Sequence, residues 1–136
     1  MNENEMNDTN EDDAQLPDLE IYVEGGDIDG MIAWLQTVFE HSDTTSQNKN
    51  SAKLRCRYEN NDIPVIIVKN AGDTGYTSIW FDSRKLPWKD DIACGKAAFK
   101  ALGKTVRCIE SVWQDGDDPD RWFEFSDQGE RIINWE

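Results

Sequence analysis

The sequence predicts an α+β fold: a single, mostly antiparallel sheet with two helices packed on one face, in the order β-α-β-β-β-α-β-β-β. Two observations indicate this class. Two segments have apolar residues at helical spacing, and the segments around them alternate apolar and polar residues between short turns. Short connections join antiparallel neighbours, and helices set between antiparallel runs pack together on one side of a sheet.

The chain of 136 residues is long enough for one domain with a real core. Residues 1–17 contain one leucine, no aromatic residue and many acids, so they cannot bury enough apolar surface to offset their ordering entropy. We therefore expect a disordered acidic tail over residues 1–17 and a single α+β domain over residues 18–136.

The first strand and first helix follow directly after this tail. Leu19, Ile21 and Val23 alternate with polar residues, the pattern of a half-buried strand. Apolar residues recur every three or four positions over residues 28–41, which predicts a helix there. Asp27, directly before it, is a good N-cap. The stretch 42–52 is polar and is expected to be a loop.

Residues 52–82 are predicted to form a three-stranded antiparallel meander. Its first strand alternates Leu54, Cys56 and Tyr58 with basic residues, and turn-forming residues separate the strands. The sheet face away from the helices is expected to carry the basic residues of the first strand. These are Lys53, Arg55 and Arg57.

The second helix is expected to begin after Asp90 or Asp91 and to end before Gly103, a typical helix terminator. A strand around Val106 and Cys108 follows, and residues 122–125 and 131–135 are predicted to form a final hairpin.

The net charge of -14 is concentrated at the two ends of the chain. Residues 1–20 carry eight acids and no base, and residues 110–136 carry nine acids and two bases. This charge disfavours nucleic acids and anionic membranes as partners and favours a basic protein. The N-terminus lacks the pattern of a signal peptide, and the longest aliphatic run, residues 65–68, is too short to span a bilayer. We therefore expect a cytoplasmic protein.

No pattern in the sequence predicts a metal site, a cofactor or a catalytic group. The three cysteines, Cys56, Cys94 and Cys108, are too scattered for a zinc site and are interpreted as reduced, buried thiols. His41, the only histidine, is expected at the C-terminal end of the first helix, where it interacts favourably with the helix dipole and with solvent. The acidic loop that starts at Asp115 fails the EF-hand spacing.

The C-terminal segment combines tryptophans with carboxylates, which is the composition that binds a basic peptide. The rings attract arginine or lysine by cation–π contact, and the acids supply the pairing charge. The predicted partner-binding residues are Trp113, Asp115, Asp117, Asp118, Asp120, Trp122 and Trp135.

The leading hypothesis is a non-catalytic protein-interaction module, such as an adaptor, an inhibitor or an immunity-like protein, that binds a basic protein partner. The element order across residues 28–109 is similar to that of type III secretion chaperones, and this resemblance implies a chaperone-like binding domain. The leading strand and final hairpin depart from it. A nucleic-acid mimic, a carboxylate-based enzyme and a carbohydrate-binding domain remain as alternatives.

Overall fold

The computed structural model describes residues 18–109 and 121–135, which form one antiparallel sheet of eight strands and two α-helices. The strands lie in the order β2-β3-β4-β5-β1-β6-β7-β8. In chain order the elements are β1 (Leu19–Glu24), α2 (Ile28–Val38), β2 (His41–Gln47), β3 (Ser51–Tyr58), β4 (Asn61–Val68), the short 3-10 helix η1 (Ala71–Asp73), β5 (Tyr76–Phe81), α3 (Asp91–Leu102), β6 (Val106–Ile109), β7 (Arg121–Ser126) and β8 (Gly129–Asn134).

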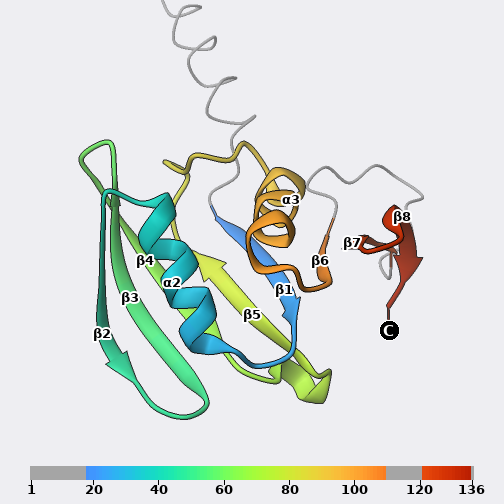
Figure 1. Ribbon diagram of the computed structural model, residues 1–136. Helices are drawn as coiled ribbons and strands as arrows, with labels where there is room; N and C mark the ends of the chain where they lie inside the picture. Colours follow the sequence, from blue (N-terminus) through green and yellow to red (C-terminus); the bar gives the residue numbers. More distant parts are fainter. Residues whose placement is uncertain (1–17, 110–120, 136) are drawn as a thin grey trace, which may run out of the picture.

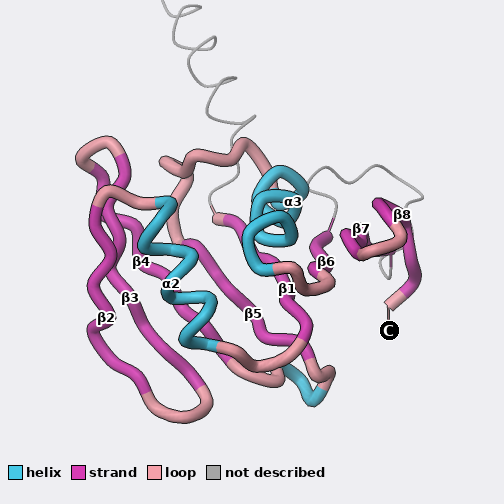
Figure 2. The backbone as a smooth tube through the Cα atoms, in the orientation of Figure 1, coloured by secondary structure: helices cyan, strands magenta, loops and turns pink. Residues whose placement is uncertain are grey.

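Both helices cover the same face of the sheet, as predicted (Figure 1). The two helices contact each other, and α3 also packs on β1, β6 and β7. Figure 2 shows the helices side by side in front of the strands. The opposite face, called the open face below, is not covered by either helix.

The predicted caps and terminator define the helix ends. A carboxylate oxygen of Asp27 accepts a hydrogen bond from the backbone N–H of Gly30 at 3.0 Å, and one of Asp90 accepts from the N–H of Ala93 at 2.8 Å. Each bond satisfies a backbone donor that the first helical turn leaves without a partner. Gly103 ends α3 in the left-handed region, with φ of 70°, where glycine carries no steric penalty.

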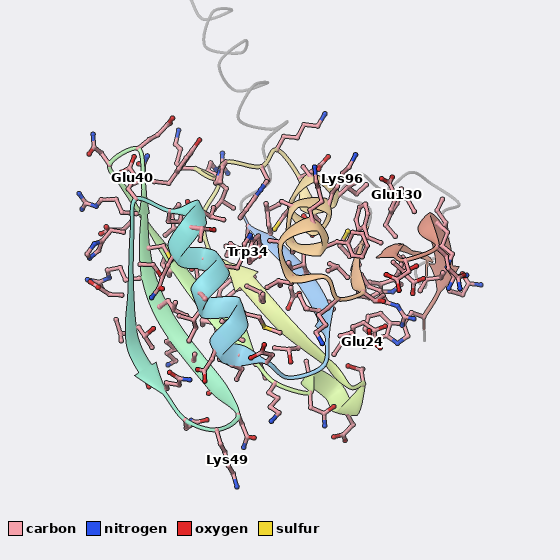
Figure 3. The ribbon with its side chains drawn as sticks, in the orientation of Figure 1. Glu24, Trp34, Glu40, Lys49, Lys96 and Glu130 are labelled. Carbon is pink, nitrogen blue, oxygen red and sulfur yellow. The ribbon has the colours of Figure 1, made fainter. Side chains whose placement is uncertain are left out.

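The core lies between the helices and one side of the sheet. In β1 the residues Leu19, Ile21 and Val23 are at most 1% exposed, whereas their neighbours in the strand are partly or fully exposed. Trp34 of α2, labelled in Figure 3, is buried in this core, and it stacks on the partly buried Trp88 with ring centroids 5.7 Å apart.

All three cysteines are buried in this core, as the sequence indicates. Burial raises the pKa of the Cys94 thiol well above its usual value of 9.0, and the nearby Asp91 carboxylate adds to the effect. Burial likewise raises the pKa of Cys56, although its hydrogen bond with Ser42 partly opposes the change. A thiol that stays protonated is a poor nucleophile, so these residues serve packing.

The prediction for residues 39–52 is wrong in two respects. The first helix ends at Val38 instead of residue 41, and the stretch 42–52, expected to be a loop, holds the edge strand β2 and the start of β3. The sheet therefore has eight strands instead of seven. Strand β2 is polar and almost fully exposed, and it is held by backbone pairing with β3. Edge strands are often polar, so they lack the alternation of apolar and polar residues by which a strand is recognised in a sequence.

His41 is correspondingly misplaced by the prediction. It does not end a helix but begins β2, where its Nε2 atom lies 2.8 Å from an oxygen of Asp43. The basic residues Lys53, Arg55 and Arg57 point to the open face as expected, because the alternate residues of β3 are buried under the helices.

Candidate binding site on the open face of the sheet

Strand register sets a row of four residues across the open face. Tyr22 of β1 pairs with Arg107 of β6, Arg107 pairs with Glu124 of β7, and Glu124 pairs with Arg131 of β8. Directly paired residues on an antiparallel sheet point to the same face and lie within contact distance. The row therefore places one carboxylate between two arginines.

Glu124 is clamped by both of these arginines. Nε of Arg107 donates to one carboxylate oxygen at 2.9 Å, and Nε of Arg131 donates to the other at 2.7 Å. The Glu124 side chain is only 3% exposed. Burial alone would raise the pKa of its carboxyl group, but the two arginine hydrogen bonds outweigh burial and lower it. Glu124 is thus a buried, ionised residue whose two oxygens are both occupied.

An aromatic cluster lies beside this clamp. Tyr22, Trp122 and Trp135 contact one another edge to face, with ring centroids 4.8 to 5.5 Å apart and interplanar angles of 70° to 89°. Tyr76 of β5 joins the cluster, with its ring centroid 5.0 Å from that of Trp135. Strands β6 and β7 separate β8 from β1, so Trp135, directly after β8, reaches back across the open face.

Arg107 connects the clamp to the cluster. Its guanidinium carbon lies 4.7 Å from the ring centroids of both Tyr76 and Trp135, within the range of cation–π attraction. The guanidinium group of Arg107 therefore already covers one face of the Tyr76 ring and one face of the Trp135 ring.

The three mutually perpendicular rings border a pocket of about 240 Å³. We call this the aromatic pocket; its lining residues are Tyr22, Trp122 and Trp135, together with Ala71, Gly72 and Thr74 of the turn between β4 and β5. The turn bends sharply because Gly72 has a φ of 62°. The hydroxyl of Thr74 donates to the carbonyl of Ala71 at 2.8 Å, which fixes this side of the pocket.

Two acids lie next to the aromatic pocket. Asp73 stands between the lining residues Gly72 and Thr74, and Glu24 ends β1 opposite Tyr76. Figure 3 shows Glu24 at the end of β1 nearest the β7–β8 hairpin. Neither acid forms an ion pair with any residue in the described part of the chain. Both remain available to a cation from outside.

The indole N–H groups of Trp122 and Trp135 have no acceptor among the described residues. The N–H of Trp80, elsewhere on the open face, donates to Asp18 at 2.7 Å. Within residues 18–109 and 121–135, no hydrogen-bond acceptor pairs with the indole N–H of Trp122 or Trp135. Because both tryptophans are partly exposed, a ligand with acceptor oxygens can reach this side of the pocket.

A second recess, of about 480 Å³, lies at the other end of the open face near β2. It contains the His41–Asp43 pair and an ion pair of 3.3 Å between Arg57 and Asp62. The side chains of both pairs are about half to two-thirds exposed, so solvent screens their charges. The recess offers neither an apolar wall nor a buried charge, and we do not assign it a ligand.

The structure brings together two of the seven predicted binding residues, Trp122 and Trp135. The other five, Trp113, Asp115, Asp117, Asp118 and Asp120, lie outside the described residues. The predicted partner-binding set did not include Tyr22, Tyr76, Arg107, Glu124 or Arg131. An aromatic residue on the exposed side of an alternating strand was the available signal for Tyr22.

Across the described part of the chain, no group of three or more potential metal ligands comes together, and no helix is long and apolar enough to cross a membrane. The fold and the site define an α+β protein with an aromatic pocket on the sheet face that neither α2 nor α3 covers. The chain matches no family model, no curated protein and no solved structure.

Proposed function

We propose that the chain is a non-catalytic protein-interaction module that binds a basic protein partner through the aromatic pocket. One observation carries the proposal. Tyr22 of β1 meets Trp122 and Trp135 of the C-terminal hairpin on the sheet face that neither α2 nor α3 covers. Tryptophan and tyrosine clusters next to a pocket are typical of interaction hot spots.

The charge distribution supports a basic partner. The net charge of -14 and the acids Glu24 and Asp73 beside the pocket attract cationic proteins over long range. An adaptor, an inhibitor, an immunity-like protein and an acidic mimic of nucleic acid are all consistent with this charge. The proposal places the protein in the cytoplasm, where its three cysteines stay reduced.

The chemistry of the clamp argues against a carboxylate-based enzyme at this site. A general acid needs a raised pKa, whereas the pKa of Glu124 is lowered, and both of its oxygens accept hydrogen bonds from arginine. A carbohydrate is the stronger competing ligand, because sugar rings also stack on tryptophan and accept hydrogen bonds from indole N–H groups.

The experiment is affinity capture from lysate of the source organism with the immobilised full-length chain, followed by mass spectrometry. The site variant is Trp122→Ala combined with Trp135→Ala. The matched control is Ile132→Ala, because Ile132 lies on the same hairpin but is 52% exposed on the opposite face. Circular dichroism establishes that all three proteins are folded.

We expect the parent chain and Ile132→Ala to retain the same basic protein, and the site variant to lose it. Retention should decrease with added salt, since charge steers the association. Equal retention by the site variant would place the interface elsewhere. Capture that survives protease treatment of the lysate but is lost after glycan removal would favour the carbohydrate alternative.

A further inference from the structure

The position of Arg107 restricts what can enter the aromatic pocket. Its guanidinium group already occupies one face of Trp135 and of Tyr76. Glu124 lies between Arg107 and Arg131, so this side of the pocket already holds two guanidinium groups of the chain itself. A lysine or arginine of the partner would therefore compete with Arg107 for the ring faces of Trp135 and Tyr76. The pocket therefore favours a neutral, apolar group, and the partner's cations bind outside it.

The shape of the pocket favours a compact, rigid group. Three rings at nearly right angles form its aromatic walls, and its volume of about 240 Å³ accommodates one or two small side chains. The pyrrolidine ring of proline meets this requirement, because it presents an apolar surface and loses almost no conformational entropy on binding. Aromatic-lined grooves recognise proline-rich segments for this reason.

The unpaired indole donors point to the same ligand. A polyproline II segment has no internal hydrogen bonds, so its backbone carbonyls are free to accept from outside. Trp122 and Trp135 each offer an indole N–H that lacks an acceptor within the described residues. A bound proline segment would supply these acceptors without giving up any hydrogen bond of its own.

The acids at the rim add a charge requirement. Glu24 and Asp73 flank the pocket without forming an ion pair to the described residues. A lysine or arginine next to the proline could pair with these exposed carboxylates. Resting on the proposed function, we therefore propose that the aromatic pocket binds a proline-containing extended segment of the partner, flanked by lysine or arginine.

The test is an NMR titration of the full-length chain with a synthetic peptide. The probe is a run of prolines with two arginines at each end, about nine residues or three turns of polyproline helix. The comparison peptide keeps the arginines and replaces every proline with alanine. We expect the indole N–H signals of Trp122 and Trp135 to shift, while that of the buried Trp34 stays in place. The alanine peptide should bind about tenfold more weakly.

A pair of charge variants tests the rim. Glu24→Gln combined with Asp73→Asn should weaken binding of the proline peptide about threefold to tenfold, because two exposed, solvent-screened attractions are lost. Glu40→Gln is the matched control, since Glu40 is exposed at the opposite end of the molecule (Figure 3). It should leave the affinity unchanged.

The outcomes separate this inference from the proposed function. Equal binding of the proline and alanine peptides would overturn the proline requirement and leave a charge-driven interaction in place. Binding without a shift at Trp122 or Trp135 would overturn the assignment to the aromatic pocket. If neither peptide binds but lysate capture still depends on the two tryptophans, the proline inference fails alone; if capture is independent of them as well, both proposals fail.

Discussion

Replacing Glu124 with glutamine removes the negative charge from the clamp while keeping the size of the side chain. The carboxylate accepts from Arg107 at 2.9 Å and from Arg131 at 2.7 Å, and it is only 3% exposed. Glutamine has one carbonyl oxygen, so it can satisfy one arginine and must present its NH₂ group to the other. The substitution leaves an arginine facing a donor.

The expected loss follows from the exposure of each arginine. Arg107 is 20% exposed, and a hydrogen bond between charged groups in such a position contributes about 1.5–3 kcal/mol. Arg131 is 56% exposed, so solvent screening limits its contribution to about 0.2–1 kcal/mol. We therefore expect Glu124→Gln to lower the free energy of unfolding by about 2–4 kcal/mol at pH 7.

The pH dependence follows from the lowered pKa of Glu124. A carboxyl group whose pKa is lower in the folded state stabilises the fold fully above its unfolded pKa, and this stabilisation is lost as pH falls through the folded pKa. The usual value is 4.5. The difference in stability between the parent chain and Glu124→Gln should thus be constant near neutral pH and shrink below about pH 4.5.

Urea unfolding followed by circular dichroism at several pH values measures this difference. The control is Glu130→Gln, whose 49% exposed carboxylate lies 3.7 Å from Lys96; it should change stability by less than about 0.5 kcal/mol. The reasoning is refuted if Glu124→Gln is as stable as the parent chain at pH 7. It is also refuted if a measured difference does not shrink on acidification.

Three further predictions concern α3 and its packing. Asp90→Ala removes the N-cap bond and should lower the free energy of unfolding by about 1 kcal/mol in thermal denaturation. Gly95→Ala places a Cβ atom 3.1 Å from the Phe125 ring. Crowding should exceed the gain in helix propensity and lower the free energy of unfolding by about 1 kcal/mol. Increased stability would mean that the Phe125 ring moves to make room for the methyl group. Cys94, with its raised pKa and complete burial, should react with a thiol reagent at pH 8 only after unfolding.

The parts of the fold that the sequence predicts correctly are those set by local interactions. Helix α3 is bounded by Asp90 and Gly103, whose capping roles depend only on the adjacent backbone. Strand β2 was missed because its pairing with β3 is a backbone interaction that polar residues satisfy equally well. Its exposed side chains give no burial pattern to recognise.

In the candidate site, too, the sequence predicts what depends on local composition and does not predict contacts between distant strands. Trp122 and Trp135 were predicted from the composition of a single segment, whereas their contacts with Tyr22 depend on the placement of β1, β6 and β7 in one sheet. The cation–π contact was expected with a partner, but the structure forms it with the chain's own Arg107. No local sequence pattern indicates which strands become neighbours. The strand order and register of the folded sheet are therefore needed to identify Tyr22 and Arg107 as neighbours of the two tryptophans.

The clamp also links the stability of the open face to its proposed binding. Glu124 holds Arg107 in place, and Arg107 in turn lies against Tyr76 and Trp135. A preorganised site binds more tightly, because fewer side chains lose freedom on association. Glu124→Gln should therefore weaken peptide binding although Glu124 contacts no ligand, whereas loss of the charge at Glu24 should weaken binding and leave stability unchanged. This contrast separates a residue that positions the pocket from one that contacts the partner.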